Sequence, residues 1–282
     1  MVDTPPNHDV PRADDAAMYL SGLYVYPIKS TGGIPLEAWD VDGRGLRYDR
    51  RWMLVDEDGW FISQRELPRM ALILVRIEPD RLVVNAPQMP ALELPLGPTT
   101  GKTVPARIWD DVVEASPVGE DADRWFGEFL DVRCRLVFLP DESVRPVDPD
   151  YGETGDQVGL ADGFPFLLIS EASLADLNAR LEHPLPMNRF RPNLVVAGCE
   201  AFAEDGWRVV RIGPITFRVV KPCSRCAITT VDQESAATGK EPLRTLARFR
   251  RVGTKVLFGQ NLIHDGTGTL CTGHPVEILQ TR

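Results

Sequence analysis

The stretch KPCSRCAITTVD, residues 221–232, holds two of the five cysteines of this chain. Residues 215–220 (ITFRVV) and 228–231 (ITTV) on either side of the cysteines are rich in β-branched side chains, which favour strands. Pro222 lacks a backbone donor and is expected to end the first strand. The sequence therefore predicts two thiols on a short loop between two strands.

Two cations accompany these thiols, because Lys221 precedes the loop and Arg225 separates Cys223 from Cys226. Positive neighbours lower the pKa of a thiol and favour the thiolate, which attacks electrophiles and binds soft metals. If the protein performs chemistry, this loop is where we expect it.

Other interpretations of the Cys-x-x-Cys pair remain open. A zinc ribbon needs a second pair, but Cys134, Cys199 and Cys271 are isolated and the four histidines show no paired spacing. A thioredoxin-type redox pair opens a helix, whereas β-prone residues flank this one. Two buried structural cysteines would also fit the pattern.

The composition is that of a soluble globular protein with a real core. The chain has 282 residues, of which 43% are apolar and 26% charged, so one large domain or two ordinary ones are expected. Its net charge of −10 argues against broad binding to nucleic acid or anionic membranes. Because the chain as a whole is acidic, a local cluster of basic residues would point to an anion-binding site.

Cysteine usage and the N-terminus favour a cytoplasmic protein. Five cysteines spread through a long chain do not fit a disulfide framework, so a reducing compartment is expected. Residues 1–17 lack the apolar core of a signal peptide, and we predict a disordered tail over 1–18. The longest apolar runs, such as 70–75 and 164–169, are too short to span a bilayer.

Hydrophobic periodicity predicts a β-rich chain with a few helices. Residues 20–118 read as short strands punctuated by Pro and Gly, which suits a barrel or sandwich. A helical period follows at 119–130, and a loop rich in Pro, Asp and Gly covers 140–163. The predicted parts are a first domain at 19–140, a linker or flap at 141–162 and a second domain at 163–282.

The second half mixes strands with short helices. Ser170 is a plausible N-cap for a helix over 171–181, and Pro242 stands near the start of another helix, where proline is tolerated. The remaining segments read as strands at 166–169, 193–197, 207–212, 256–258, 261–264 and 275–279.

Three other segments place cations beside turns: YPIKS at 26–30, DRRW at 49–52 and NRFRPN at 188–193. A lysine and a hydroxyl next to a glycine turn suit anion binding through side chains and backbone amides. Arginine-bearing loops would form a phosphate or carboxylate site if they converged. The alternatives are an exposed hairpin end and surface arginines paired with some of the 41 acids.

Taken together, these stretches resemble the MOSC-domain proteins that carry an N-terminal MOSC β-barrel domain, the group that includes the mitochondrial amidoxime-reducing component and its bacterial relatives. The resemblance implies a mixed α/β, β-rich fold, with an N-terminal β-barrel-like domain plus a C-terminal MOSC β-barrel domain with peripheral helices. The matching segments are YPIKS (26–30), DR with Trp (49–52), FLLISEASLADLNARL (166–181), FRPN (190–193), CSRC with TTVD (223–232), KEPL (240–243) and FGQ (258–260).

The resemblance also implies a molybdenum cofactor, Mo-molybdopterin, held between the two domains. The second cysteine of the CSRC-like loop ligates molybdenum in such proteins, which makes Cys226 the expected metal ligand and catalytic residue and leaves Cys223 as its neighbour. A thiolate suits this metal, and basic side chains neutralise the phosphate of the pterin. The positions that the resemblance assigns to the cofactor are Lys29, Ser30, Arg50, Arg191, Asn193, Ser224 and Arg225, with Asn261 where mitochondrial members have a tyrosine.

The implied reaction is reduction of N-hydroxylated compounds (hydroxylamines, amidoximes and N-hydroxylated bases) to the amine or imine, with chemistry that the cofactor carries. Some bacterial relatives have a C-terminal [2Fe–2S] ferredoxin domain, whereas this chain reaches Arg282 without its cysteines. We therefore expect a separate electron donor, a ferredoxin- or cytochrome b5-like protein with its reductase. Two alternatives remain open: sulfur transfer to the cofactor through a cysteine persulfide, and a cofactor carrier.

Overall fold

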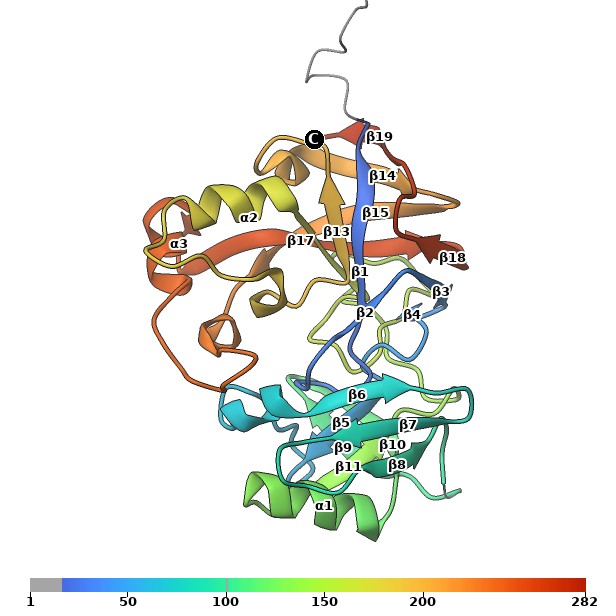
Figure 1. Ribbon diagram of the computed structural model, residues 1–282. Helices are drawn as coiled ribbons and strands as arrows, with labels where there is room; N and C mark the ends of the chain where they lie inside the picture. The colour runs from blue at the N-terminus through green and yellow to red at the C-terminus, as the bar shows by residue number, and fades with distance from the viewer. Residues whose placement is uncertain (1–16, 100) are drawn as a thin grey trace, which may run out of the picture.

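The computed structural model describes residues 17–99 and 101–282. The tail predicted over 1–18 lies outside these residues except for its last two positions. Figure 1 shows two β-rich parts stacked on one another, with helices at their periphery. The prediction of a mixed, β-rich fold is confirmed. Within the described part of the chain, no helix is both long and apolar enough to cross a membrane.

A nine-stranded sheet forms the upper part of the molecule in Figure 1. Its central pair, β12 and β13, is parallel, and the other neighbours along the order pair antiparallel. All four residues of β13 are buried, as expected for a strand covered on both faces. The order is β19 (Val276–Thr281), β14 (Trp207–Ile212), β15 (Ile215–Ser224), β17 (Lys255–Asp265), β12 (Phe166–Ser170), β13 (Leu194–Ala197), β1 (Tyr19–Val25) and β2 (Ile34–Leu36), with β16 (Arg251–Val252) beside β17.

Smaller sheets form the lower part and the junction. Two of them contribute to a compact apolar core that includes Trp52, Phe126 and Leu136, all fully buried, whereas the third packs against the core of the large sheet. The strands are β5 (Trp52–Val55), β11 (Arg135–Phe138), β10 (Asp111–Pro117) and β9 (Val104–Ile108) in one sheet, β6 (Leu74–Ile77), β7 (Arg81–Asn85) and β8 (Leu92–Pro95) in a second, and β18 (Gly268–Cys271), β3 (Ala38–Asp42) and β4 (Gly45–Leu46) in a third.

The helices follow the predicted signals. In α1 (Glu120–Leu130), Trp125, Phe126 and Phe129 lie on one buried face, as their spacing predicts. Ser170 caps α2 (Glu171–Asn178), because its side chain accepts a hydrogen bond from the backbone nitrogen of Ser173 at 3.1 Å. The other helical segments are α3 (Leu243–Phe249) and the 3₁₀ turns η2 (Pro68–Leu72), η3 (Met187–Arg189), η4 (Ala203–Gly206) and η5 (Ala227–Thr230).

Strand pairing crosses the predicted division at residue 140. Strands β1 and β2, from the start of the chain, complete the sheet built by residues 163–282, and β3 pairs with β18. The domain limits stay a prediction, but the first 30 or so described residues belong structurally to the upper part. The chain therefore passes from β1 into the junction at 26–30 and returns to the large sheet in β2.

Two local predictions around the cysteine loop are wrong. Strand β15 does not end at Pro222 but continues to Ser224, because register shifts on either side of Pro222 accommodate a residue without a donor. Residues 228–231 do not form a strand, since the hydroxyls of Thr229 and Thr230 bond to the carbonyls three residues earlier, at 3.0 and 2.7 Å, and support η5. Cys226 is the N-cap residue of that turn.

Gly259 in β17 is required by both conformation and space. Its φ is +79°, in the left-handed region, and a Cβ there would meet Ile169 Cγ1 at 2.7 Å and the carbonyl oxygen of Leu168 at 2.9 Å. Gly253 offers a matched control, because its φ is +58° and nothing lies within 4 Å of its would-be Cβ.

We predict that Gly259→Ala lowers the free energy of unfolding by about 2–4 kcal/mol, from backbone strain plus overpacking against β12. Gly253→Ala should lower it by only about 1 kcal/mol, because the strain acts alone. Urea unfolding of both variants measures the difference. Equal losses would show that close packing at Gly259 contributes nothing.

Candidate functional site

One pocket at the junction brings together every residue that the sequence predicted for the site. It encloses about 770 Å³ of empty space, part of it open to solvent. The lining comes from both halves of the chain and from the loop between them. Its predicted members are Lys29, Ser30, Arg50, Arg191, Asn193, Ser224, Arg225, Cys226 and Asn261.

The two thiols have different surroundings in this pocket. Cys223 Sγ accepts a hydrogen bond from Arg225 Nη1 at 3.0 Å, and Arg225 Nη2 donates to the carbonyl of Phe190 at 2.5 Å. Arg225 Nε is buried without a partner. Cys226 is half-buried at the start of η5, where its carbonyl accepts from the backbone of Thr229. Both thiols are free, and the Arg225 guanidinium is engaged with Cys223.

Tyr26 lies between two arginines. The guanidinium carbons of Arg50 and Arg191 sit 4.2 and 4.4 Å from the centre of its ring, within the range of cation–π attraction. Its hydroxyl donates to the carbonyl of Pro192 at 3.0 Å, and burial raises the pKa of Tyr26 to about 12, so the ring stays neutral. A Cβ on Gly33 would come within 2.4 Å of this ring, which explains the glycine there.

Arg50 and Asn193 tie the two halves of the chain together. Arg50 Nη1 donates to Asp49 Oδ2 at 2.6 Å and to Asn193 Oδ1 at 3.2 Å. Asn193 Nδ2 donates in turn to the carbonyl of Tyr24 at 3.1 Å. The amide of Asn193 thus holds the end of β1 and the Arg50 guanidinium in fixed positions on the pocket wall.

Three of the predicted site residues hold a left-handed backbone. The φ angles are +68° at Ser30, +45° at Arg50 and +57° at Arg191. Residues with a side chain rarely adopt this region, which costs roughly 1–2 kcal/mol for each. Such conformations persist where the surrounding structure imposes them, and they gather at functional sites.

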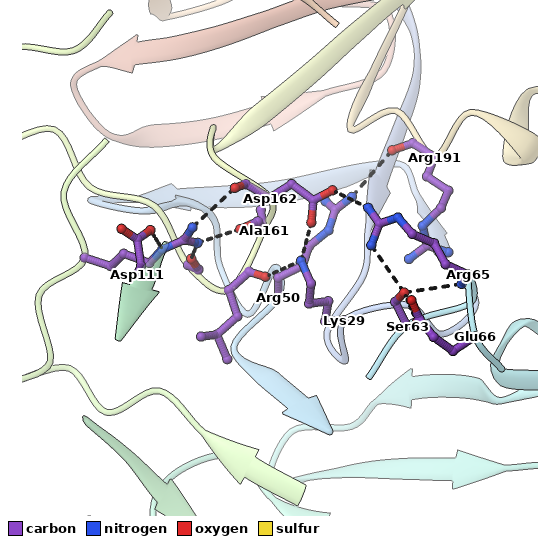
Figure 2. Close-up of polar contacts among 12 residues, drawn as sticks. Lys29, Arg50, Ser63, Arg65, Glu66, Asp111, Ala161, Asp162 and Arg191 are labelled. Carbon is purple, nitrogen blue, oxygen red and sulfur yellow. Dashed lines mark hydrogen bonds and ion pairs between the residues drawn. The ribbon is translucent and has the colours of Figure 1, made fainter. Parts of the chain in front are cut away.

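Lys29 reaches into the pocket and meets Asp162, a residue that the sequence did not single out. Lys29 Nζ donates to Asp162 Oδ1 at 2.5 Å and to the carbonyl of Leu160 at 2.9 Å. Figure 2 shows Asp162 also contacting Arg65, whose Nη2 lies 3.2 Å from Oδ2. The carboxylate therefore links one lining lysine to an arginine outside the lining.

Burial and charge shift the pKa values of this pair. Burial lowers the pKa of Lys29 to about 8, although the neighbouring Asp162 opposes the shift. Burial raises the pKa of Asp162, but Lys29 and Arg65 lower it more, so it lies below its usual range. Both groups are charged at neutral pH.

Arg145 is a second residue that the sequence reading missed. It is buried and donates to the carbonyls of Gly159 and Ala161 at 2.8 and 2.5 Å. It also pairs with Asp111 at 2.8 Å. Arg145 thus fixes the end of the segment predicted as a linker or flap, which supplies Asp162. These roles have no spacing signature, because they arise within an irregular loop.

Gln64 and Gln233 form a third missed feature. Each side-chain amide donates to the other, at 3.3 and 3.0 Å, although they are 169 residues apart. Gln64 is fully buried and also donates to the carbonyl of Ser30 at 2.8 Å. The pair joins the first half of the chain to the loop after η5 and supports the strained backbone at Ser30.

The lining carries a surplus of positive charge. Four cations, Lys29, Arg50, Arg191 and Arg225, face a single lining carboxylate, Asp162, in a chain whose net charge is −10. Burial lowers the pKa of Arg191 only to about 10, so it stays charged at neutral pH. A pocket with this balance attracts an anion such as a phosphate.

The cysteine thiols of the pocket suit a soft metal that is also bound by an organic cofactor. Among the described residues, no three His, Cys, Asp or Glu side chains gather as metal ligands. A metal bound to Cys226 would therefore take most of its ligands from a bound organic group. The unpartnered Arg225 Nε and the four lining cations fit the anionic part of such a group.

Comparisons with known proteins agree with this architecture. The MOSC N-terminal beta barrel domain matches residues 17–133, and the MOSC domain matches 155–277. Mitochondrial amidoxime-reducing component 1 of Mus musculus is 37% identical over 276 residues, which cover 91% of this chain and 81% of that protein. Its Homo sapiens counterpart is 36% identical, with 91% and 82% covered. Mitochondrial amidoxime reducing component 2 of Rattus norvegicus is 35% identical over 277 residues, with the same coverage.

The resemblance inferred from the sequence motifs is confirmed by these matches. Both family domains occur in the expected order, and the relatives align over nearly the whole described chain. The chain belongs to the MOSC-domain family with an N-terminal MOSC β-barrel domain, and it is homologous to the mitochondrial amidoxime-reducing components.

Proposed function

We propose that the pocket holds a molybdenum cofactor and that the protein reduces N-hydroxylated compounds such as hydroxylamines, amidoximes and N-hydroxylated bases. The observation that carries the proposal is the convergence of the Cys226 thiol with four cations in a single pocket between the two halves of the chain. The names of the homologous proteins support amidoximes as a substrate class.

The lining residues would take two roles, holding the metal and holding the anionic part of the cofactor. Cys226 would supply a thiolate ligand, while Lys29, Arg50, Arg191 and Arg225 would hold the pterin phosphate by charge-assisted hydrogen bonds. Ser30, Asn193, Ser224 and Asn261 line the same pocket and offer neutral hydrogen-bonding groups. When bound, the cofactor would supply two-electron reduction.

The chain itself supplies positioning. Reducing N–OH to N–H with release of water consumes two electrons and two protons. Lys29 carries its charge at Nζ on the pocket wall, where it would hold the anionic part of the cofactor. Asp162 stays ionised and holds that ammonium in place. The surrounding structure holds the backbones of Ser30, Arg50 and Arg191 in left-handed conformations at the pocket wall.

Electrons would come from a separate protein, a ferredoxin- or cytochrome b5-like donor with its reductase. The five free cysteines of the described chain are consistent with the reducing cytoplasmic setting that we propose.

We predict that Cys226→Ser lowers the molybdenum content of the purified protein about tenfold or more, because the thiolate ligand is lost. Cys223→Ala is the matched control and should keep most of the metal, since Cys223 is engaged with Arg225. Elemental analysis of freshly purified protein measures both.

Three results would contradict the proposal in different ways. Equal loss of molybdenum in both variants would indicate a chelating cysteine pair. Molybdenum-free protein that is active and carries a persulfide would favour sulfur transfer. Molybdenum-loaded protein that is inert toward hydroxylamines with chemically supplied electrons would favour a cofactor carrier.

We predict that cofactor retention falls as the pH rises above about 8, because Lys29 then loses the charge that holds the phosphate. A bound phosphate raises the pKa of its lysine, so the fall begins at pH 8 or somewhat higher. Lys29→Arg keeps its charge and should hold the cofactor through pH 10. Dialysis at pH 7–10 followed by molybdenum analysis tests this, and identical curves for the two proteins would refute it.

In cofactor-free protein, loss of the proton from Lys29 should instead stabilise the fold as the pH rises. The pKa of Lys29 is about 8 in the folded protein against an ordinary 10.5, so the unfolded chain binds more protons between these values. The free energy of unfolding should therefore gain about 3 kcal/mol from this group as the pH rises from 8 to 10.5. Denaturation of wild-type protein and Lys29→Met at several pH values measures it, because the variant should lack this gain.

A further inference from the structure

A tryptophan occupies the turn between β9 and β10 in a conformation that disfavours it. Ile108 pairs with Asp111, so Trp109 and Asp110 form a two-residue hairpin loop. The φ of Trp109 is +55°, in the region that such turns usually give to Gly, Asn or Asp. A bulky residue there is an outlier, and the surrounding structure must hold it.

The neighbours of Trp109 fix its ring but leave much of it uncovered. The guanidinium of Arg65 lies 4.7 Å from the ring centre and covers one face. Phe61 meets the indole edge-on, with ring centroids 5.0 Å apart and planes at 61°. The residue remains 45% exposed, so part of it faces solvent.

This surface adjoins the pocket through Asp162. Arg65, which lies over the indole of Trp109, forms an ion pair with the carboxylate of Asp162. Asp162 lines the pocket and binds Lys29, as Figure 2 shows. Phe61 also lies under Lys29, with Nζ 5.1 Å from its ring centre. Trp109 and Arg65 therefore stand one residue outside the pocket lining.

Trp60 provides a comparison within the same sheet. It is 46% exposed and lies near a guanidinium, with Arg107 at 5.6 Å from its ring. Its backbone pairs with Arg107, whereas Phe61, the next residue, pairs with Val55. Successive residues of an extended chain point to opposite faces, so Trp60 points away from the face that Phe61 shares with Lys29.

We propose that Trp109 and Arg65 form a stacking platform beside the pocket lining that favours N-hydroxylated substrates with a flat aromatic group, such as aryl amidoximes, over small aliphatic ones. The proposal rests on the function proposed above and assigns a specificity determinant to it. An indole face gains affinity by stacking on any flat ring, while a methyl group in the same place gains little.

The test compares two amidoximes that share one reacting group, benzamidoxime and acetamidoxime, using molybdenum-loaded protein and electrons from a reduced viologen dye. Trp109→Gly removes the ring and suits a positive φ, so the variant should fold at least as well as wild type. We expect its KM for benzamidoxime to rise about tenfold and its KM for acetamidoxime to change less than about twofold. Trp109→Phe should restore much of the difference, and Trp60→Ala should alter neither value.

A second measurement separates the platform from the proposed reaction. Binding of benzamidine and acetamidine, the corresponding amidines, is titrated calorimetrically with wild type and Trp109→Gly, with no turnover needed. A selective loss of benzamidine affinity in Trp109→Gly supports the platform. If wild type reduces neither amidoxime, the proposed reaction is refuted, but this binding result still stands. Equal effects on both ligands, no effect, or the same selectivity in Trp60→Ala would overturn the platform.

Discussion

The site depends on a short stretch of backbone pairing where the chain passes from the upper part to the lower part. Lys29 donates its backbone N–H to the carbonyl of Trp52 at 2.7 Å, and Arg50 donates to that of Tyr26 at 2.8 Å. Because these bonds join residues 26–29 to 50–52, the lysine and arginine of two distant motifs must lie on one wall. The buried Trp52 anchors this pairing in the lower core.

Around that pairing, the fold concentrates positive charge within an acidic molecule. Arg50 and Arg191 flank the neutral ring of Tyr26, and Arg225 extends toward Phe190 and Cys223. Buried cations repel one another, and the structure compensates with aromatic faces, carbonyls and the carboxylates of Asp49 and Asp162. The surplus that remains is unusual for a protein interior and is most simply explained by an anionic occupant.

The sequence predicts correctly the elements that neighbouring residues determine. It does not predict features that depend on contacts between residues far apart in the chain. The apolar face of α1 and the Ser170 cap are set by neighbouring residues, so both were recovered. Threonine favours strands, but after Cys226 the hydroxyls of Thr229 and Thr230 bond to backbone carbonyls and stabilise a 3₁₀ turn instead. Asp162 and the Gln64–Gln233 pair depend on contacts across more than 100 residues, for which one sequence carries no pattern.

The pairing of β1 with β13 makes the second half of the chain structurally incomplete on its own. A fragment beginning after residue 140 would keep the parallel pair of β12 and β13 but would expose the outer edge of β13, four buried residues with open hydrogen-bonding groups. Such an edge recruits strands from other molecules. Separating the two halves of the chain therefore removes the strand that covers this edge.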